Sequence, residues 1–255
     1  MPEESLKASE RFTNRAKLYA LARPDYPEKA IDFICSHCNL VPGKKLLDLG
    51  AGTGISSRAF AARELNVTAV EPNAAMMDEA LSHREFKNRI KYIKAAAENT
   101  ALPDAEFDAV ISAQAFHWFQ PEPALQEMQR LLKAGAWAVL IWNERDESDR
   151  FTKEYGEILR SLPNTASVEM NRAKAGNSLL ESSLFKNGSR ETFENEQILD
   201  LDKFLGRALS ASYAPDPDSP EAFEFQERLR ALFERYKNEN LVCIKYECSV
   251  YSAQK

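Results

Sequence analysis

The sequence lacks the features that mark several classes of protein. Its 255 residues contain no apolar run long enough to span a bilayer, and the first five residues lack the basic and apolar regions of a signal peptide. No block of basic residues occurs, and the net charge of −6 argues against a nucleic-acid substrate. There are only four cysteines, which we expect to be reduced thiols in a cytoplasmic protein that does not contact a membrane.

The cysteines also give little support for a metal site. Cys35 and Cys38 have a spacing that could begin a zinc site or a redox pair. Cys243 and Cys248 lie far along the chain and are not spaced as a second ligand pair. We therefore expect a helix end with incidental cysteines at 35–38, and no metal.

The most informative segment runs from Lys45 to Ile55. An apolar run there ends in Asp48, and three glycines then alternate with small residues. This pattern predicts a buried parallel strand, a tight turn and the start of a helix. A second predicted strand, 67–70, ends at Glu71, about twenty residues past the glycines. An acid in that position is placed to bond the ribose of a nucleotide held at the carboxyl edge of the sheet.

Two common nucleotide motifs are missing from this segment. The dinucleotide fingerprint needs glycine or alanine where Ile55 or Ser57 stands, and no lysine follows the glycines as a phosphate loop requires. The Asp-x-Gly-x-Gly-x-Gly pattern that remains resembles motif I of class I S-adenosylmethionine-dependent methyltransferases. The resemblance implies that the three glycines pass under the methionine part of the cofactor and that Glu71 holds its ribose.

The fold class expected is α/β, with a doubly wound and mostly parallel sheet. Predicted strands and helices alternate between residues 45 and 145. We expect strands at 45–49, 67–70, 90–93, 107–112, 137–142, 190–196 and 241–252. We expect helices at 55–64, from Asn73 to Leu81, after Pro121 with Leu132 on its apolar face, at 151–162, at 201–209 and at 220–236. The resemblance implies seven strands, the last of them antiparallel.

We expect a single methyltransferase domain over residues 1–255. Residues 1–40 are expected to form an N-terminal helical lid, and residues 41–145 the cofactor-binding core. The polar stretch at 163–190 has few periodic apolar positions, so we interpret residues 146–190 as an inserted cap of helix and loop after strand five. Residues 191–255 are expected to complete the sheet and its helices.

Three further segments narrow the resemblance to a subgroup that includes fungal trans-aconitate methyltransferases and bacterial small-molecule methyltransferases of types 11 and 25. These are residues 12–27, with Phe12 at the start and Arg23-Pro24 near the end, residues 96–110, and residues 114–119. The residues expected to contact the cofactor are Tyr19, Arg23, Asp48, Gly50, Gly52, Gly54, Glu71, Pro72, Met76, Ala97, Glu98 and Gln114. Those expected on the substrate side are His117, Trp118, Trp142, Ser212 and Tyr213.

Several of these side chains suit the expected chemistry. The guanidinium of Arg23 can bond the cofactor carboxylate with two parallel contacts, and the Trp118 ring can face a sulfonium. His117 could be a general base if the acceptor is a hydroxyl, an amine or an acidic carbon, whereas a carboxylate needs none. The alternatives are a surface ion pair for Arg23 and a hydrogen-bonded scaffold role for His117.

The sequence therefore favours an enzyme that transfers a methyl group from S-adenosylmethionine to a small-molecule acceptor, with a lean toward O-methylation of a carboxylate. We expect a monomer or homodimer that binds no nucleic acid. One alternative is a non-catalytic protein that binds the cofactor as a sensor or serves as a partner subunit. A nicotinamide-dependent oxidoreductase is disfavoured by Ile55 and Ser57. A nucleic-acid or protein methyltransferase is disfavoured by the acidity and by the lack of an Asn-Pro-Pro-Tyr-like run.

Overall fold

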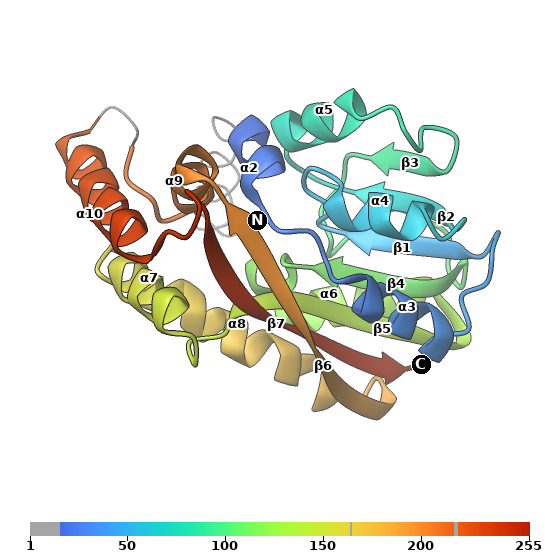
Figure 1. Ribbon diagram of the computed structural model, residues 1–255. Helices are drawn as coiled ribbons and strands as arrows, with labels where there is room; N and C mark the ends of the chain where they lie inside the picture. The colour runs from blue at the N-terminus through green and yellow to red at the C-terminus, as the bar shows by residue number, and fades with distance from the viewer. Residues whose placement is uncertain (1–15, 164, 217–218) are drawn as a thin grey trace.

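The protein is built around a seven-stranded sheet with the strand order β3-β2-β1-β4-β5-β7-β6 (Figure 1). The computed structural model describes residues 16–163, 165–216 and 219–255. Strands β1 to β5 pair in parallel, and β7 pairs antiparallel with both β5 and β6. The strands are β1 Lys45–Leu49, β2 Asn66–Val70, β3 Ile90–Ile93, β4 Phe107–Ala113, β5 Leu132–Arg145, β6 Lys186–Leu199 and β7 Val242–Gln254. The predicted α/β fold, with its antiparallel last strand, is confirmed.

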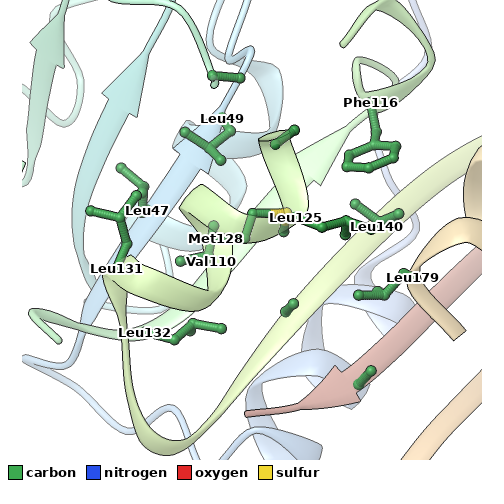
Figure 2. Close-up of a cluster of buried hydrophobic side chains, with 14 of the residues drawn as sticks. Leu47, Leu49, Val110, Phe116, Leu125, Met128, Leu131, Leu132, Leu140 and Leu179 are labelled. Atoms are coloured by element: carbon green, nitrogen blue, oxygen red, sulfur yellow. The ribbon is translucent and has the colours of Figure 1, made fainter. Parts of the chain in front are cut away.

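Helices cover both faces of the sheet. The helices are α2 Ala16–Ala22, α3 Glu28–His37, α4 Ile55–Ala61, α5 Ala74–Ser82, η1 Phe116–Trp118, α6 Pro121–Leu131, α7 Arg150–Arg160, α8 Thr165–Leu180, α9 Leu201–Leu209 and α10 Pro220–Tyr236. Helix α3 packs Ile31 and Ile34 into a buried cluster with Leu46. Helix α6 places Leu125 and Met128 in a second cluster, which Figure 2 shows. The central parallel strands β1 and β4 are thus buried on both faces, whereas β3 at the edge is only partly buried.

Several helices begin where the sequence offers a capping side chain. Asn73 accepts a hydrogen bond from the Met76 N–H, which confirms the predicted start of α5. Asp149, Asp200 and Ser219 cap α7, α9 and α10 in the same way. Each side chain satisfies one backbone donor that has no partner inside the helix.

Two predicted helix ends were wrong. The helix predicted at 55–64 ends at Ala61, because the chain turns back at Glu64, whose φ is +62°. Leu132 does not lie on the helix that follows Pro121. It begins β5 and pairs with Phe107 of β4, so the fifth strand is much longer than the predicted 137–142. Leu132 is fully buried in the same cluster as α6, which explains why its apolar character fitted the helical pattern.

The stretch at 163–190, predicted to belong to a cap of helix and loop, contains the sixteen-residue helix α8, whose bounds were not predicted. This helix meets the sheet through small residues. A Cβ atom added to Gly176 would lie 2.5 Å from the ring of Tyr251 on β7. Contact through a glycine leaves few large apolar residues in the sequence, and the helical period is therefore hidden.

The segment between α2 and α3 is held against the end of the sheet where β5 and β6 lie. Asn143 on β5 and Asn195 on β6 both donate hydrogen bonds to the backbone oxygen of Asp25, at 3.2 and 2.9 Å. Gln197 donates to the oxygen of Ala22 at 3.0 Å. Helix α2 also contacts α9 and α5, and it lies between them in Figure 1. These contacts fix the end of α2, which carries Arg23 just beyond it.

The described residues contain neither a helix that could span a membrane nor a cluster of metal ligands. None of the described helices combines the length and apolar character that a membrane crossing needs. Within the same residues, no group of three or more histidine, cysteine, aspartate or glutamate side chains could hold a metal ion.

Candidate active site

The glycine turn after β1 has one side against protein and one side open. Gly50, Gly52 and Gly54 have φ values of +72°, +56° and +79°, a region that side chains with a Cβ rarely adopt. A Cβ at Gly50 would lie 2.6 Å from the Cβ of Ala115, whereas one at Gly52 would meet no atom within 4 Å. Gly50 is therefore needed for packing, and Gly52 borders space that a ligand can occupy.

Glu71, at the end of β2, is bonded to this turn. Its Oε2 accepts a hydrogen bond from the Gly52 N–H at 2.9 Å, and its Oε1 accepts one from the Asn73 N–H at 2.8 Å. Burial raises the pKa of the carboxyl, and the two backbone donors oppose that shift. Pro72 follows Glu71 directly, and Met76 is buried on α5. The acid predicted to hold a ribose thus also holds the turn in place.

Asp48 is a fully buried carboxyl, and one of its oxygens has no hydrogen-bond partner within the described residues. Its Oδ2 accepts hydrogen bonds from the hydroxyls of Ser56 and Ser57 at 2.6 and 2.7 Å. Its Oδ1 is buried and has no hydrogen-bond partner among the described residues. Burial raises the pKa of Asp48 to about 6, against the lowering effect of the two serines.

Seven of the residues predicted from the sequence line a single pocket, together with Arg172, which was not predicted. The pocket and the open solvent at its mouth together measure about 340 Å³. Its lining comes from α2 and the residue after it, the residue that follows β4, η1, α8 and the turn after α9. The lining residues are Tyr19, Arg23, Gln114, His117, Trp118, Arg172, Ser212 and Tyr213. No carboxylate is among them, although the lining includes two guanidinium groups.

Arg23 lies against the ring of Tyr19, with its guanidinium carbon 4.5 Å from the ring centroid. One nitrogen donates to the backbone oxygen of Ser210 at 3.1 Å, while the buried Nε has no partner among the described residues. Burial, and then the charge of Arg207, lower the pKa of Arg23. Within the part of the chain that the structure describes, Arg23 makes no ion pair.

Arg172 on α8 is in a similar state. It donates to Oε1 of Gln114 at 3.3 Å, and its buried Nε has no partner among the described residues. Gln114 follows β4 with a φ of +57° and donates from Nε2 to the backbone oxygen of Asn143 at 3.2 Å. Gln114 is thereby fixed between β5 and α8. Arg172 had no motif around it in the sequence, and only its position in the fold brings it to the pocket.

His117 is neutral, and its hydrogen bond assigns the position of its proton. The Trp142 Nε1–H donates to His117 Nδ1 at 3.4 Å, so the proton of the neutral ring lies on Nε2. Burial, followed by the charges of Arg172 and Arg23, lowers the pKa of His117 well below its usual value. Trp142 itself is only 1% exposed and does not line the pocket, so it acts on the site through His117.

Two other predicted cofactor residues lie in the loop after β3. Ala97 is buried, and Oε1 of Glu98 accepts a hydrogen bond from the Gln120 N–H at 2.9 Å, just before α6. This bond gives Glu98 a structural partner at the start of that helix. Phe12, at the start of the N-terminal motif, lies outside the described residues.

The residues present fit S-adenosylmethionine. Its amino-acid part carries a carboxylate and an ammonium. Among the described residues, a guanidinium nitrogen of Arg23 and a carboxylate oxygen of Asp48 have no hydrogen-bond partner. The open side of the turn at Gly52 leaves room beside the backbone. These features complement the cofactor in charge, and they lie on or follow elements at the carboxyl edge of the parallel strands.

Comparison with known proteins agrees with this geometry. Residues 47–140 match the family model described as a methyltransferase domain. The chain contains a class I, S-adenosylmethionine-dependent methyltransferase domain. An uncharacterized methyltransferase of Mycobacterium bovis is 36% identical over 148 residues, which are 58% of this chain and 58% of that protein. An uncharacterized methyltransferase of Schizosaccharomyces pombe is 26% identical over 93% of this chain and 94% of its own length.

The methyltransferase fold extends well beyond the matched domain. A solved structure from Anaeromyxobacter dehalogenans, assigned provisionally as a type II methyltransferase, has a TM-score of 0.67 and is 25% identical. It covers 91% of this chain and 97% of its own. The chain spans only 58% of the length of the mycobacterial relative that it matches.

Proposed function

We propose that this protein transfers the methyl group of S-adenosylmethionine to a carboxylate of a small organic acid and so forms a methyl ester. The observation that carries the proposal is the charge of the pocket. Its lining contains Arg23 and Arg172 but no acid, and within the described residues neither arginine makes an ion pair. Guanidinium groups without acidic partners favour the binding of carboxylates.

When bound, the cofactor supplies a methyl group already activated by a sulfonium leaving group. The chain then has to hold the acceptor in line with that methyl group and keep water out. Arg23 and Tyr19 would hold the cofactor carboxylate, and the free oxygen of Asp48 matches an ammonium. Glu71 keeps the glycine turn in the shape that the cofactor requires.

The state of His117 supports an acceptor that needs no base. Its Nδ1 is occupied by Trp142, and its Nε2 carries the proton, so the ring offers a donor rather than a free acceptor. A carboxylate acceptor loses no proton on methylation and can accept a hydrogen bond from that donor. A hydroxyl or amine acceptor would need a base that this tautomer does not provide.

The test begins with calorimetric titration of the purified protein with S-adenosylmethionine and S-adenosylhomocysteine, with NADH as the control ligand. Methyl-labelled cofactor is then incubated with a panel of short-chain carboxylic acids. A methyl ester releases labelled methanol on mild alkaline hydrolysis, whereas a methyl group on nitrogen or carbon does not. Alkali-labile label supports the proposal, and alkali-stable label contradicts it. Cofactor binding without transfer to any member of a broad acceptor panel would favour the non-catalytic alternative.

A further inference from the structure

Arg23 lies in a segment without regular secondary structure, between α2 and α3. The segment contains Pro24 and Pro27, which have no backbone N–H and do not continue a helix. Backbone carbonyls in such a segment need hydrogen-bond partners from elsewhere in the protein. The position of the Arg23 guanidinium at the pocket therefore depends on groups outside its own segment.

Two asparagines of the sheet hold the carbonyl of Asp25. Asn143 on β5 donates to it from Nδ2 at 3.2 Å, and Asn195 on β6 donates to it at 2.9 Å. The two amides are also bonded to each other, because Asn195 donates to Oδ1 of Asn143 at 3.1 Å. Asn143 is only 5% exposed, and these bonds satisfy its amide. The two side chains and the carbonyl thus form a closed set of three hydrogen bonds.

A second contact holds the backbone on the other side of Arg23. Gln197 donates from Nε2 to the oxygen of Ala22 at 3.0 Å, and its Oε1 accepts a hydrogen bond from the Tyr246 hydroxyl at 3.4 Å. Asn195 and Gln197 are two residues apart on β6, and alternate residues of a strand point to the same face. One face of this edge strand therefore holds the chain both before and after Arg23.

Asn143 is also bonded to a second residue of the pocket. Its backbone oxygen accepts a hydrogen bond from Nε2 of Gln114 at 3.2 Å, and Gln114 lines the pocket together with Arg23. The end of β5 is thus connected to two lining residues, to Gln114 directly and to Arg23 through Asp25. Neither Asn143 nor Asn195 lines the pocket itself.

We propose that Asn143 and Asn195 are positioning residues, which hold Asp25 so that the guanidinium of Arg23 meets the carboxylate of the cofactor. This inference rests on the proposed function, in which Arg23 binds that carboxylate. An arginine on a loosely held segment would have to be ordered when the ligand binds, and that ordering would reduce the affinity. The edge of the sheet farthest from β3 thereby sets the affinity for the amino-acid part of the cofactor.

The experiment substitutes Asn195, which is less buried than Asn143 and makes two of the three bonds. Asn195→Ala removes the amide, whereas Asn195→Asp keeps its shape but removes the N–H donors. Asn187→Ala and Asn187→Asp are the matched controls, because Asn187 is exposed on the same strand and donates to the side chain of Gln254. Calorimetry compares S-adenosylhomocysteine with methylthioadenosine, which lacks the amino-acid part. Hydrogen exchange of the ligand-free protein reports how firmly residues 19–26 are held.

We expect both Asn195 variants to weaken S-adenosylhomocysteine binding at least about fivefold and to leave methylthioadenosine binding unchanged. Both should speed hydrogen exchange at residues 19–26, and both Asn187 variants should behave as the unaltered protein does. In an Arg23→Met background, Asn195→Ala should not weaken S-adenosylhomocysteine binding further, because the asparagine acts through Arg23.

Equal weakening of the two ligands, or a loss that adds to that of Arg23→Met, would mean that Asn195 only supports the fold and would overturn the inference. Unchanged affinity of Asn195→Ala for S-adenosylhomocysteine, or weaker binding without faster exchange at residues 19–26, would overturn it as well. Failure of the unaltered protein to bind S-adenosylhomocysteine at all would instead contradict the proposed function. The exchange measurement is made without ligand, so it would still show whether Asn195 holds the segment.

Discussion

The Oε2 atom of Glu71 accepts a hydrogen bond from the backbone N–H of Gly52 at 2.9 Å. This bond joins two parts of the motif that are nineteen residues apart in sequence. The acid at the end of β2 therefore has a structural task before any ligand binds, because it fixes the turn whose open side lies at Gly52. The two sides of that turn differ, because Gly50 is packed against protein and Gly52 is not.

Alanine at Gly50 and alanine at Gly52 should fail in different ways. A Cβ at Gly50 would lie 2.6 Å from Ala115 and 2.9 Å from the ring of Phe119, so Gly50→Ala should lower the free energy of unfolding by at least about 2 kcal/mol. Gly52→Ala should cost only about 1 kcal/mol, the strain of a positive φ. It should weaken S-adenosylhomocysteine binding at least tenfold, because its methyl group occupies the open space. Denaturant unfolding measures the stabilities, and calorimetry measures the affinities. Normal affinity of Gly52→Ala for S-adenosylhomocysteine would contradict the placement of the ligand beside Gly52.

Asp48 should make the ligand-free protein less stable as the pH rises. Its pKa is about 6 in the folded state against 3.8 ordinarily, so the folded state binds the proton more tightly. The stability associated with this proton is fully present below about pH 4 and is lost as the pH rises through 6. Asp48→Asn, which stays neutral, should therefore be more stable than the unaltered protein at pH 8 by about 2–3 kcal/mol. Urea unfolding from pH 4 to 8 tests this, and a difference that does not change with pH would contradict it.

Arg23 should contribute to binding only where the ligand has a carboxylate. Arg23→Met should weaken S-adenosylhomocysteine binding at least tenfold, since a hydrogen bond to a charged group contributes about 1.5–3 kcal/mol. Binding of methylthioadenosine, which lacks the amino-acid part, should not change. Arg84→Met is the control, because Arg84 is an exposed arginine after α5. Equal weakening of both ligands would mean that Arg23 supports the fold or the nucleoside instead.

His117 should remain neutral throughout the pH range in which a catalytic histidine would titrate. Burial and the charges of Arg172 and Arg23 disfavour the protonated ring, and Trp142 occupies Nδ1. Nitrogen NMR of the labelled protein should show the Nε2–H tautomer with constant shifts from pH 5.5 to 8, and His117→Gln assigns the signal. A titration midpoint near 6.5, or the opposite tautomer, would return His117 to the role of general base.

Local sequence patterns predicted the strands from β1 to β4 more accurately than the elements that follow them. The strands at Lys45–Leu49 and Ile90–Ile93 agree residue for residue, because each is a short apolar run bounded by turn residues. The bounds of helix α8 could not be predicted within the expected cap, because this helix contacts Tyr251 at Gly176, and a glycine adds no large apolar residue to a helical pattern.

The candidate site shows the same division. The glycines, Asp48 and Glu71 form a motif with fixed spacing, so sequence alone brings them together. Arg172 lies in a polar stretch with no recognisable motif, and only the folded structure places it at the pocket. There, the nearby Glu169 pairs with Arg145 instead of with Arg172. A residue of this kind can be identified as a candidate only when the structure shows which charged groups around it form ion pairs.

The two arginines that line the pocket lie outside residues 47–140, the segment by which the chain is recognised as a relative of other methyltransferases. Arg23 is set by the asparagines that hold Asp25, and Arg172 by a helix that follows the fifth strand. The segment that matches the family model and the two arginines of the pocket thus lie in different parts of the chain, so one can change while the other is kept. Under the proposed function, a substitution at Arg172 would therefore alter the pocket and leave unchanged the central segment that the family model matches.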